Sequence, residues 1–147
     1  MRNIRKKEQE ELLKETEKDF LVFQTGFVIE LGRGEYFRCI RNGSISCGTL
    51  PYARRFQSQG EAERYVFLKL HYYGLEAHIC RTAWYLGSWD EAGKGWDGSR
   101  FTDEIEKAVL FESIREAEKY QKSRHLEMES YIEGTAVRMQ CVAVRTA

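Results

Sequence analysis

Apolar and polar residues alternate in the first part of the chain and predict several short β-strands. These expected strands cover residues 20–23, 27–31, 36–40 and 44–49. Asn42 and Gly43 separate the last two, and this dipeptide is typical of a type I′ hairpin turn, because both central residues of that turn have positive φ. A second turn is expected at the glycines of residues 32–34.

Further along, the pattern changes to helical spacing. Apolar residues recur on one side of a helix that would begin after Ser58 and end at Gly74: Ala62, Tyr65, Val66, Leu70 and Tyr73. A second, more polar helix is expected at about residues 114–124. Strands are expected at residues 76–81, 84–86, 107–111 and 136–145, with a turn-rich stretch at 88–100.

An internal similarity links the two helical regions. Residues 53–65 recur as residues 108–120, and the two segments share Ala, Phe, Ser, Glu, Ala, Glu and Tyr at matching places. Ser58 and Ser113 each stand three residues before a glutamate, Glu61 and Glu116, which is the spacing of a capping box. Residues 81–83 and 145–147 are both Arg-Thr-Ala. Duplication of one folding unit is the interpretation that these features favour.

The expected fold class is therefore α+β, with a charged N-terminal helix at residues 1–19 followed by two tandem ββ(β)αβ units. The first unit covers residues 20–83 and the second covers residues 84–147. Mainly antiparallel sheets are expected, with the helices on one face. Because each unit alone would bury little surface, the two units are expected to pack against each other.

Composition narrows the class of protein. With 42% hydrophobic residues, 31% charged residues and a single proline, the chain is expected to fold. No apolar run approaches the roughly 18 residues that span a bilayer, and residues 1–19 lack an apolar signal core, so no membrane association and a cytoplasmic location are predicted. The formal charges of residues 1–19, 20–83 and 84–147 are 0, +3 and −3, from 6, 8 and 9 basic and 6, 5 and 12 acidic side chains. That distribution argues against a dedicated duplex-DNA binder, which needs a broad cationic face.

The unit resembles a small module found in phage and prophage accessory proteins of Gram-positive bacteria. The resemblance rests on the opening strand Phe27-Val28-Ile29 and on the pattern Ala-x-x-Phe-x-Ser-x-x-Glu-Ala-Glu, which occupies residues 53–63 and again residues 108–118. It implies a protein of a mobile element that inhibits a bacterial defence system, in the manner of anti-CRISPR proteins, by binding and blocking an effector in the host bacterial cytoplasm. The expected partner is a protein, without a cofactor and without catalysis.

The glycine-rich stretch at residues 86–100 supplies the first candidate binding residues. It carries two Trp-Asp pairs, Trp89-Asp90 and Trp96-Asp97, and loop tryptophans give rigid contact area to a partner. The competing interpretation is that one or both rings fold back as a lid over the second core. Arg54 and Arg55 in the basic half complete the predicted partner-binding set.

Two other functions stay open. Tyr36, Phe37, Arg38 and Arg41, with the arginine pair at 54–55, form the mixture of aromatic and basic residues that binds single-stranded nucleic acid or nucleotides. A small enzyme that uses Asp90 and Asp97, or a cysteine, is the third hypothesis.

Metal binding is not expected. His78 and Cys80 share one strand face but would need two further ligands to hold zinc. The cysteines follow no Cys-x-x-Cys spacing, and they are expected to be free thiols, although Cys39 and Cys47 flank the hairpin turn and are expected to approach each other.

Overall fold

The computed structural model describes residues 25–145, and the strands within that range form a single antiparallel sheet. The strands are β1 (Phe27–Gly32), β2 (Glu35–Arg41), β3 (Ser44–Gly48), β4 (Glu76–Ser88), β5 (Gly95–Trp96), β6 (Phe101–Thr102) and β7 (Ser130–Arg145). Their order is β3-β2-β1-β4-β5-β6, and β7 pairs with β4. No helix among the described residues is long and apolar enough to cross a lipid bilayer.

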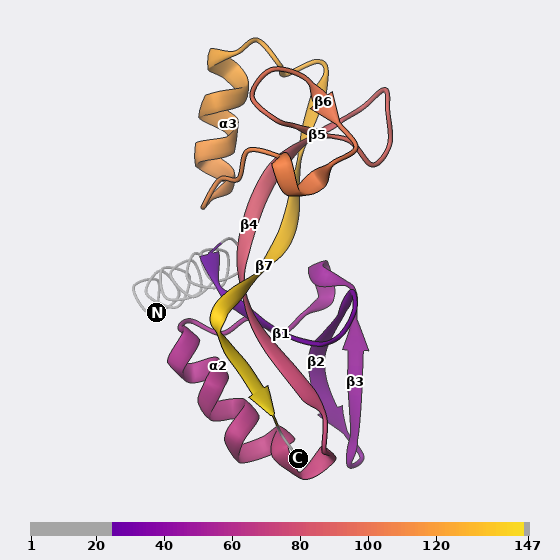
Figure 1. Cartoon of the computed structure of the whole chain (residues 1–147), viewed down its shortest axis with the longest axis vertical. Coiled ribbons are helices and arrows are strands. Elements are labelled where there is room, and N and C mark those ends of the chain that lie inside the picture. Colours follow the sequence, from indigo (N-terminus) through magenta and orange to yellow (C-terminus); the bar gives the residue numbers. More distant parts are fainter. Residues whose placement is uncertain (1–24, 146–147) are drawn as a thin grey trace, which may run out of the picture.

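The two longest strands run through the whole molecule as a twisted ribbon. β7 pairs with β4 from Glu76↔Arg145 to Ser88↔Ser130. β1 pairs with the first half of β4, and β5 pairs with its last residues. Figure 1 shows α2, β1, β2 and β3 at one end of this ribbon and α3, β5 and β6 at the other. The ribbon therefore holds the two ends together through continuous backbone pairing.

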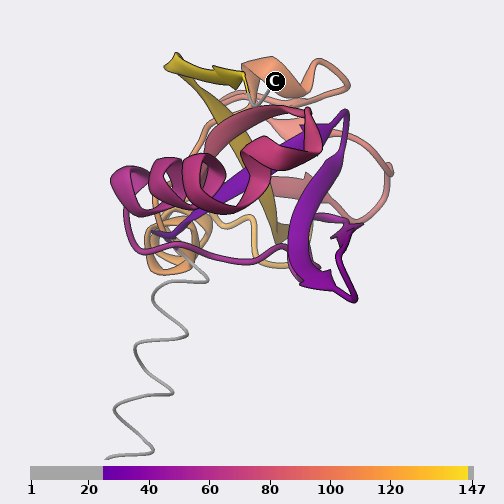
Figure 2. The same cartoon turned by 90° about the horizontal axis from the view of Figure 1, so that it is seen from below.

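The longer helical element covers the lower end of the sheet. It begins as α2 (Gln59–Tyr65), continues as the π-helix η2 (Val66–Leu70) and the 3-10 turn η3 (His71–Tyr73), and ends at Gly74, whose φ is +63°. Figure 2 shows it lying across the strands. The predicted helix and its glycine stop are confirmed.

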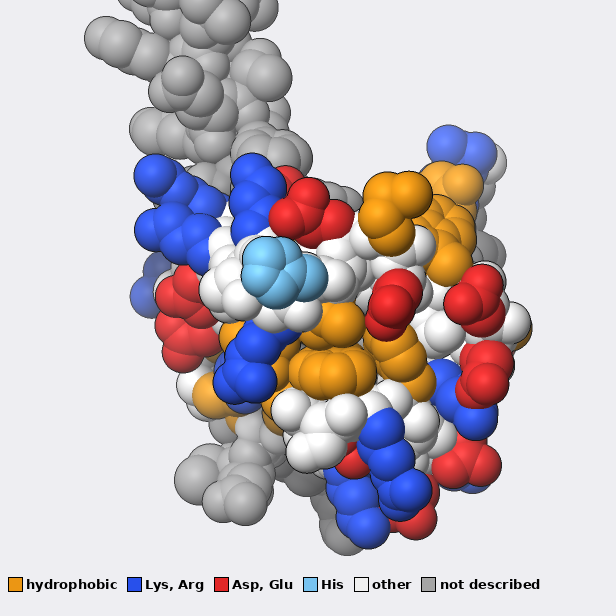
Figure 3. All heavy atoms as spheres, turned by 90° about the horizontal axis from the view of Figure 1, so that it is seen from above, with side chains coloured by type: hydrophobic (Ala, Val, Ile, Leu, Met, Phe, Trp, Pro, Cys, Tyr) orange, Lys and Arg blue, Asp and Glu red, His pale blue; other side chains and the backbone are white. Residues whose placement is uncertain are grey.

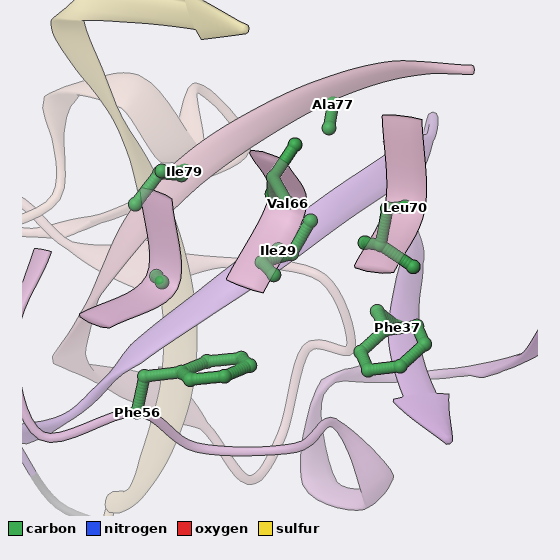
Figure 4. Close-up of a cluster of buried hydrophobic side chains, with 8 residues drawn as sticks. Ile29, Phe37, Phe56, Val66, Leu70, Ala77 and Ile79 are labelled. Atoms are coloured by element: carbon green, nitrogen blue, oxygen red, sulfur yellow. The ribbon is translucent and has the colours of Figure 1, made fainter. Parts of the chain in front are cut away.

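A closely packed apolar cluster lies between this helix and the sheet. Figure 4 shows its members, which are all at most 1% exposed: Ile29, Phe37, Phe56, Ala62, Val66, Leu70, Ala77 and Ile79. The side chains come from β1, β2, β4, the helix and, for Phe56, the segment just before the helix, so the same residues join the helix to the sheet. We call this group the α2 cluster, and it is the larger core among the described residues.

The shorter helix α3 (Ile114–Ser123) packs at the upper end of the molecule in Figure 1. It covers a second cluster of buried residues, Leu86, Ala117 and Leu126, which we call the α3 cluster. Side chains alternate between the two faces of a strand. Ile79 packs in the α2 cluster and Leu86 in the α3 cluster, and they lie an odd number of residues apart on β4. The two helices therefore cover opposite faces of the sheet, and the prediction that both lie on one face is wrong.

The predicted fold class is also wrong. The chain is mostly one antiparallel sheet and not an α+β pair of tandem ββ(β)αβ repeats. β4 continues without a break through the predicted unit boundary between Ala83 and Trp84, because the residues on both sides are buried and none of them is a turn former. The predicted helix at residues 1–19 and the predicted strand at 20–23 lie outside the described residues.

Local structure differs from prediction in the second half as well. Residues 107–111 form no strand, since η4 (Ile105–Lys107) and a single bridge between Trp84 and Phe111 replace it. β7 begins at Ser130 and not at residue 136. The Asn42-Gly43 hairpin is confirmed, with φ values of 52° and 76°.

The two serine caps have matching geometry. Ser58 and Ser113 have φ, ψ of −143°, 159° and −144°, 159°. The Ser58 Oγ accepts a hydrogen bond from the Glu61 amide at 3.1 Å, and the Ser113 Oγ accepts one from the Glu116 amide at 3.2 Å. Each glutamate accepts a bond in return, from the amide of the residue before the serine. Both predicted capping boxes are confirmed.

Removing either serine oxygen is expected to destabilise the protein. Ser58→Ala and Ser113→Ala should each lower the free energy of unfolding by about 1 kcal/mol, because an amide at the helix start loses its acceptor. Urea unfolding followed by circular dichroism measures the change. Ser58→Asp keeps an acceptor and should stay near the wild-type value; equal loss in Ser58→Ala and Ser58→Asp would contradict the capping role.

Candidate functional site

The end of the β4–β7 ribbon exposes large apolar side chains. Trp89 follows β4 and is 65% exposed, and Met128 precedes β7 and is 91% exposed. The Trp89 amide donates to the Glu129 carbonyl at 3.1 Å, which extends the strand pairing by one residue beyond Ser88 and Ser130. We call Trp89, Met128 and Tyr131 the ribbon tip. Figure 3 views this end of the molecule and shows hydrophobic side chains among charged ones.

Tyr131 fixes the position of Trp89. Their ring centroids are 4.7 Å apart, with the planes tilted by 46°. The Tyr131 ring in turn lies against Gly87, the residue opposite it on β4, so closely that a Cβ there would be 2.6 Å from the ring carbon that carries the hydroxyl. The absence of a side chain at Gly87 thus lets Tyr131 lie across β4 and support Trp89.

A methyl group at Gly87 is expected to displace Tyr131. Gly87→Ala should disturb the Trp89–Tyr131 contact and lower the free energy of unfolding by about 1–3 kcal/mol, the usual cost of overpacking. Near-ultraviolet circular dichroism reports the aromatic contact, and urea unfolding reports the stability. Gly60→Ala is the matched control, because an added Cβ there has no atom within 4 Å. Indistinguishable spectra for the two variants would contradict this packing.

A carboxylate lies next to this aromatic pair. The hydroxyls of Tyr85 and Tyr131 both donate to the Oε2 atom of Glu133, at 3.0 and 3.1 Å. Burial first, and then these hydrogen bonds to a carboxylate, raise the pKa of both tyrosines. The two hydroxyls therefore stay protonated and keep the Glu133 side chain in place.

An acidic depression of about 310 Å³ lies beside the tip. Its lining residues are Ser88, Asp90, Glu91, Lys94, Phe101 and Glu129. Lys94 forms an ion pair with Glu91, and this hydrogen bond raises the pKa of the lysine. The lining thus contains three carboxylates and one cation that is already paired. Asp90, a predicted binding residue, is exposed and belongs to this depression.

Trp96 and Asp97, unlike Trp89 and Asp90, are held by contacts within the chain. The Trp96 Nε1 donates to the Tyr120 hydroxyl at 3.1 Å, and its ring meets that of Phe101 at 5.2 Å. Trp96 also packs against the α3 cluster. The Asp97 Oδ1 accepts bonds from the amides of Arg100 and Ser99 at 2.9 and 2.8 Å, and these bonds hold its pKa below the usual range. The two Trp-Asp pairs therefore differ: the first faces solvent and the second closes a loop.

The structure places the two predicted arginines, Arg54 and Arg55, in different surroundings. The Arg54 guanidinium lies over the rings of Tyr65 and Phe56, at 4.6 and 5.2 Å. Arg55 is half-buried, and burial lowers its pKa. It borders a cavity of about 270 Å³ together with Thr49, Leu50, Pro51, Trp84, Glu133 and Gly134. Arg54 therefore packs on rings at the edge of the lower core, and Arg55 borders this cavity.

The predicted nucleic-acid residues are divided between different environments. Phe37 is fully buried in the α2 cluster, so its ring is not accessible for base stacking. Tyr36 lies on the other face of β2 beside a small cluster that contains Val28 and Cys80, and burial raises its pKa. Arg38 lies over the Tyr52 ring at 5.5 Å, and Arg41 is exposed. The structure does not bring these four side chains to one surface.

The described residues contain no cluster of three or more histidine, cysteine or acidic side chains placed to hold a metal ion. His78 contacts Glu76 at 3.1 Å, and Cys80 is buried. Burial raises the pKa of the Cys80 thiol to about 12, with the nearby Glu30 adding to the effect. Cys39 and Cys47 lie on paired strands, opposite Ser46 and Phe37, and both are free.

A second exposed apolar surface was missed by the sequence argument. Phe67, Leu68 and Tyr72 are 69%, 53% and 80% exposed on the helical element, and we call them the helix surface. The sequence contained a signal for it, since these residues are apolar or aromatic but fall off the inward stripe of Val66 and Leu70. For Met128, Tyr131 and Glu133 no comparable signal existed.

Comparison with known proteins finds no family model, no curated protein and no solved structure that matches the chain.

Proposed function

We propose that this chain is a non-enzymatic protein-binding module that docks a partner on the ribbon tip. The observation that carries the proposal is the joint exposure of Trp89 and Met128 beside Tyr131, which holds Trp89 in place. Tryptophan and tyrosine supply much of the binding free energy at protein interfaces, and methionine adapts its shape to a partner. A preordered Trp–Tyr pair also loses little conformational entropy on binding.

The proposed biological role is inhibition. The resemblance of residues 53–63 and 108–118 to a phage and prophage module supports a protein that binds a bacterial defence effector and blocks it. The site of action would be the cytoplasm of the bacterial host. Asp97 supports no acid/base role, because its carboxylate accepts two backbone hydrogen bonds within a loop.

Affinity capture tests the docking surface. Tagged wild-type protein would be mixed with bacterial lysate and compared with the double variant Trp89→Ala/Met128→Ala. The matched control is Phe67→Ala/Tyr72→Ala, which removes similarly exposed side chains from the helix surface. We expect a specific partner to be retained by the wild type and the control and lost by the tip variant. Retention by the tip variant would overturn the proposal.

Single-stranded nucleic acid is the competing ligand. A mobility-shift assay with a single-stranded oligonucleotide at low salt distinguishes it, because phosphate contacts are strongest there. Protein docking predicts no shift. If the tip variant still shifted the oligonucleotide, nucleic acid and not a protein would be the ligand to propose.

A further inference from the structure

One face of the ribbon carries aromatic rings and a carboxylate together. Alternation places Tyr85 and Gly87 on the same face of β4, and Trp89 continues this alternation one residue beyond the strand. β7 places Glu133 and Tyr131 opposite Tyr85 and Gly87. Leu86, which packs under α3, lies on the other face. Trp89 and Glu133, which are exposed, and Tyr131, which is half-buried, therefore lie on the side of the ribbon that α3 leaves uncovered.

Glu133 places a carboxylate at this surface. Its side chain is exposed, and its Oε2 atom accepts the two tyrosine hydroxyls. The ion pairs found among the described residues involve four other carboxylates, those of Glu30, Glu76, Glu91 and Glu104. Two neutral donors orient the carboxylate without neutralising it, which leaves it able to attract a cation.

The rings add a second kind of attraction. The faces of tryptophan and tyrosine bind cations through the ring quadrupole, and tryptophan is the strongest of the side chains in this respect. Trp89 and Tyr131 meet at a 46° tilt, so the two rings are neither parallel nor isolated from each other. A tilted pair of an exposed tryptophan and a half-buried tyrosine beside a carboxylate is a suitable receptor for a positively charged side chain.

The surrounding charge agrees with this. Asp90, Glu91 and Glu129 border the depression at the same end of the ribbon, and the one lysine in its lining is paired with Glu91. Such a surface favours a basic partner and disfavours an acidic one, through steering and through complementary contacts.

We infer that the ribbon tip recognises a lysine- or arginine-bearing segment of its protein partner, with the cation held against Trp89 and Tyr131 and facing the Glu133 carboxylate. This inference rests on the proposed function and names the chemistry of the partner.

A decalysine peptide is the probe, and a decaglutamate peptide is its charge-reversed control. Binding is measured by tryptophan fluorescence titration at low salt with the full chain. We expect decalysine to bind and decaglutamate not to bind. Glu133→Gln and Trp89→Ala should each weaken decalysine binding by about five- to tenfold. Both altered side chains are exposed, so the variants are expected to fold, which circular dichroism verifies.

Glu118→Gln is the matched variant, because it removes an exposed negative charge from α3 and leaves the tip unchanged. It should change decalysine affinity less than twofold. Equal weakening by Glu118→Gln and Glu133→Gln would show general electrostatic attraction and overturn the inference, as would equal binding of the two peptides. Either result would leave the proposed function in place if capture still depends on Trp89 and Met128, so the two claims fail separately.

Discussion

Phe56→Ala is expected to lower the free energy of unfolding by about 3–5 kcal/mol, the largest effect of any single change considered. Phe56 is 1% exposed and belongs to the α2 cluster (Figure 4). Its backbone exchanges two hydrogen bonds with Phe27, at 2.9 and 2.8 Å, and its ring meets Tyr65 at 5.3 Å. Alanine removes the ring and leaves a cavity that a backbone anchored in this way is poorly able to close.

Urea unfolding followed by far-ultraviolet circular dichroism measures this loss. Phe67→Ala is the control, since it removes the same side chain from a position that is 69% exposed, and it should change the unfolding free energy by less than about 0.5 kcal/mol. Similar losses for the two phenylalanines would mean that the helix packs on the sheet through a different face than the one described.

Replacing the two tryptophans one at a time should separate binding from stability. Trp89→Ala is expected to weaken partner affinity by at least about 2 kcal/mol, or roughly 30-fold, with little change in stability. Trp96→Ala should instead lower the unfolding free energy by about 2 kcal/mol, because it removes a half-buried ring and its hydrogen bond to Tyr120.

The two effects are measured by titration of the captured partner and by urea unfolding of the free chain. Each tryptophan variant is the control for the other. If Trp96→Ala reduced affinity as strongly as Trp89→Ala at a temperature where both are folded, the binding surface would have to extend across the loop to the second Trp-Asp pair.

Short-range signals in the sequence predicted local structure well. Ser58 with Glu61, Ser113 with Glu116, the Asn42-Gly43 turn and Gly74 each act through their own backbone neighbours, so their effects are visible in a few residues. The joining of the two halves depends on pairing between β4 and β7, which are distant in sequence. No local pattern specifies that pairing, and the repeated Arg-Thr-Ala at residues 81–83 lies inside β4 and does not end a unit.

The candidate site also depends on contacts between residues that are distant in the sequence. Trp89 and Trp96 have equivalent sequence surroundings, each before an aspartate in a glycine-rich stretch. They differ only through partners elsewhere in the chain, Tyr131 for the first and Tyr120 for the second. Met128 and Glu133 join the site because β7 returns alongside β4, which the sequence did not reveal.

Site-specific photocrosslinking tests the central claim most directly. A photoreactive benzoyl-phenylalanine would replace Trp89 in one protein and Tyr72, which is 80% exposed on the helix surface, in another. After irradiation with the captured partner, the ribbon-tip account predicts a covalent adduct from position 89 and none from position 72. An adduct from position 72 alone would contradict it and would place the interface on the opposite end of the molecule.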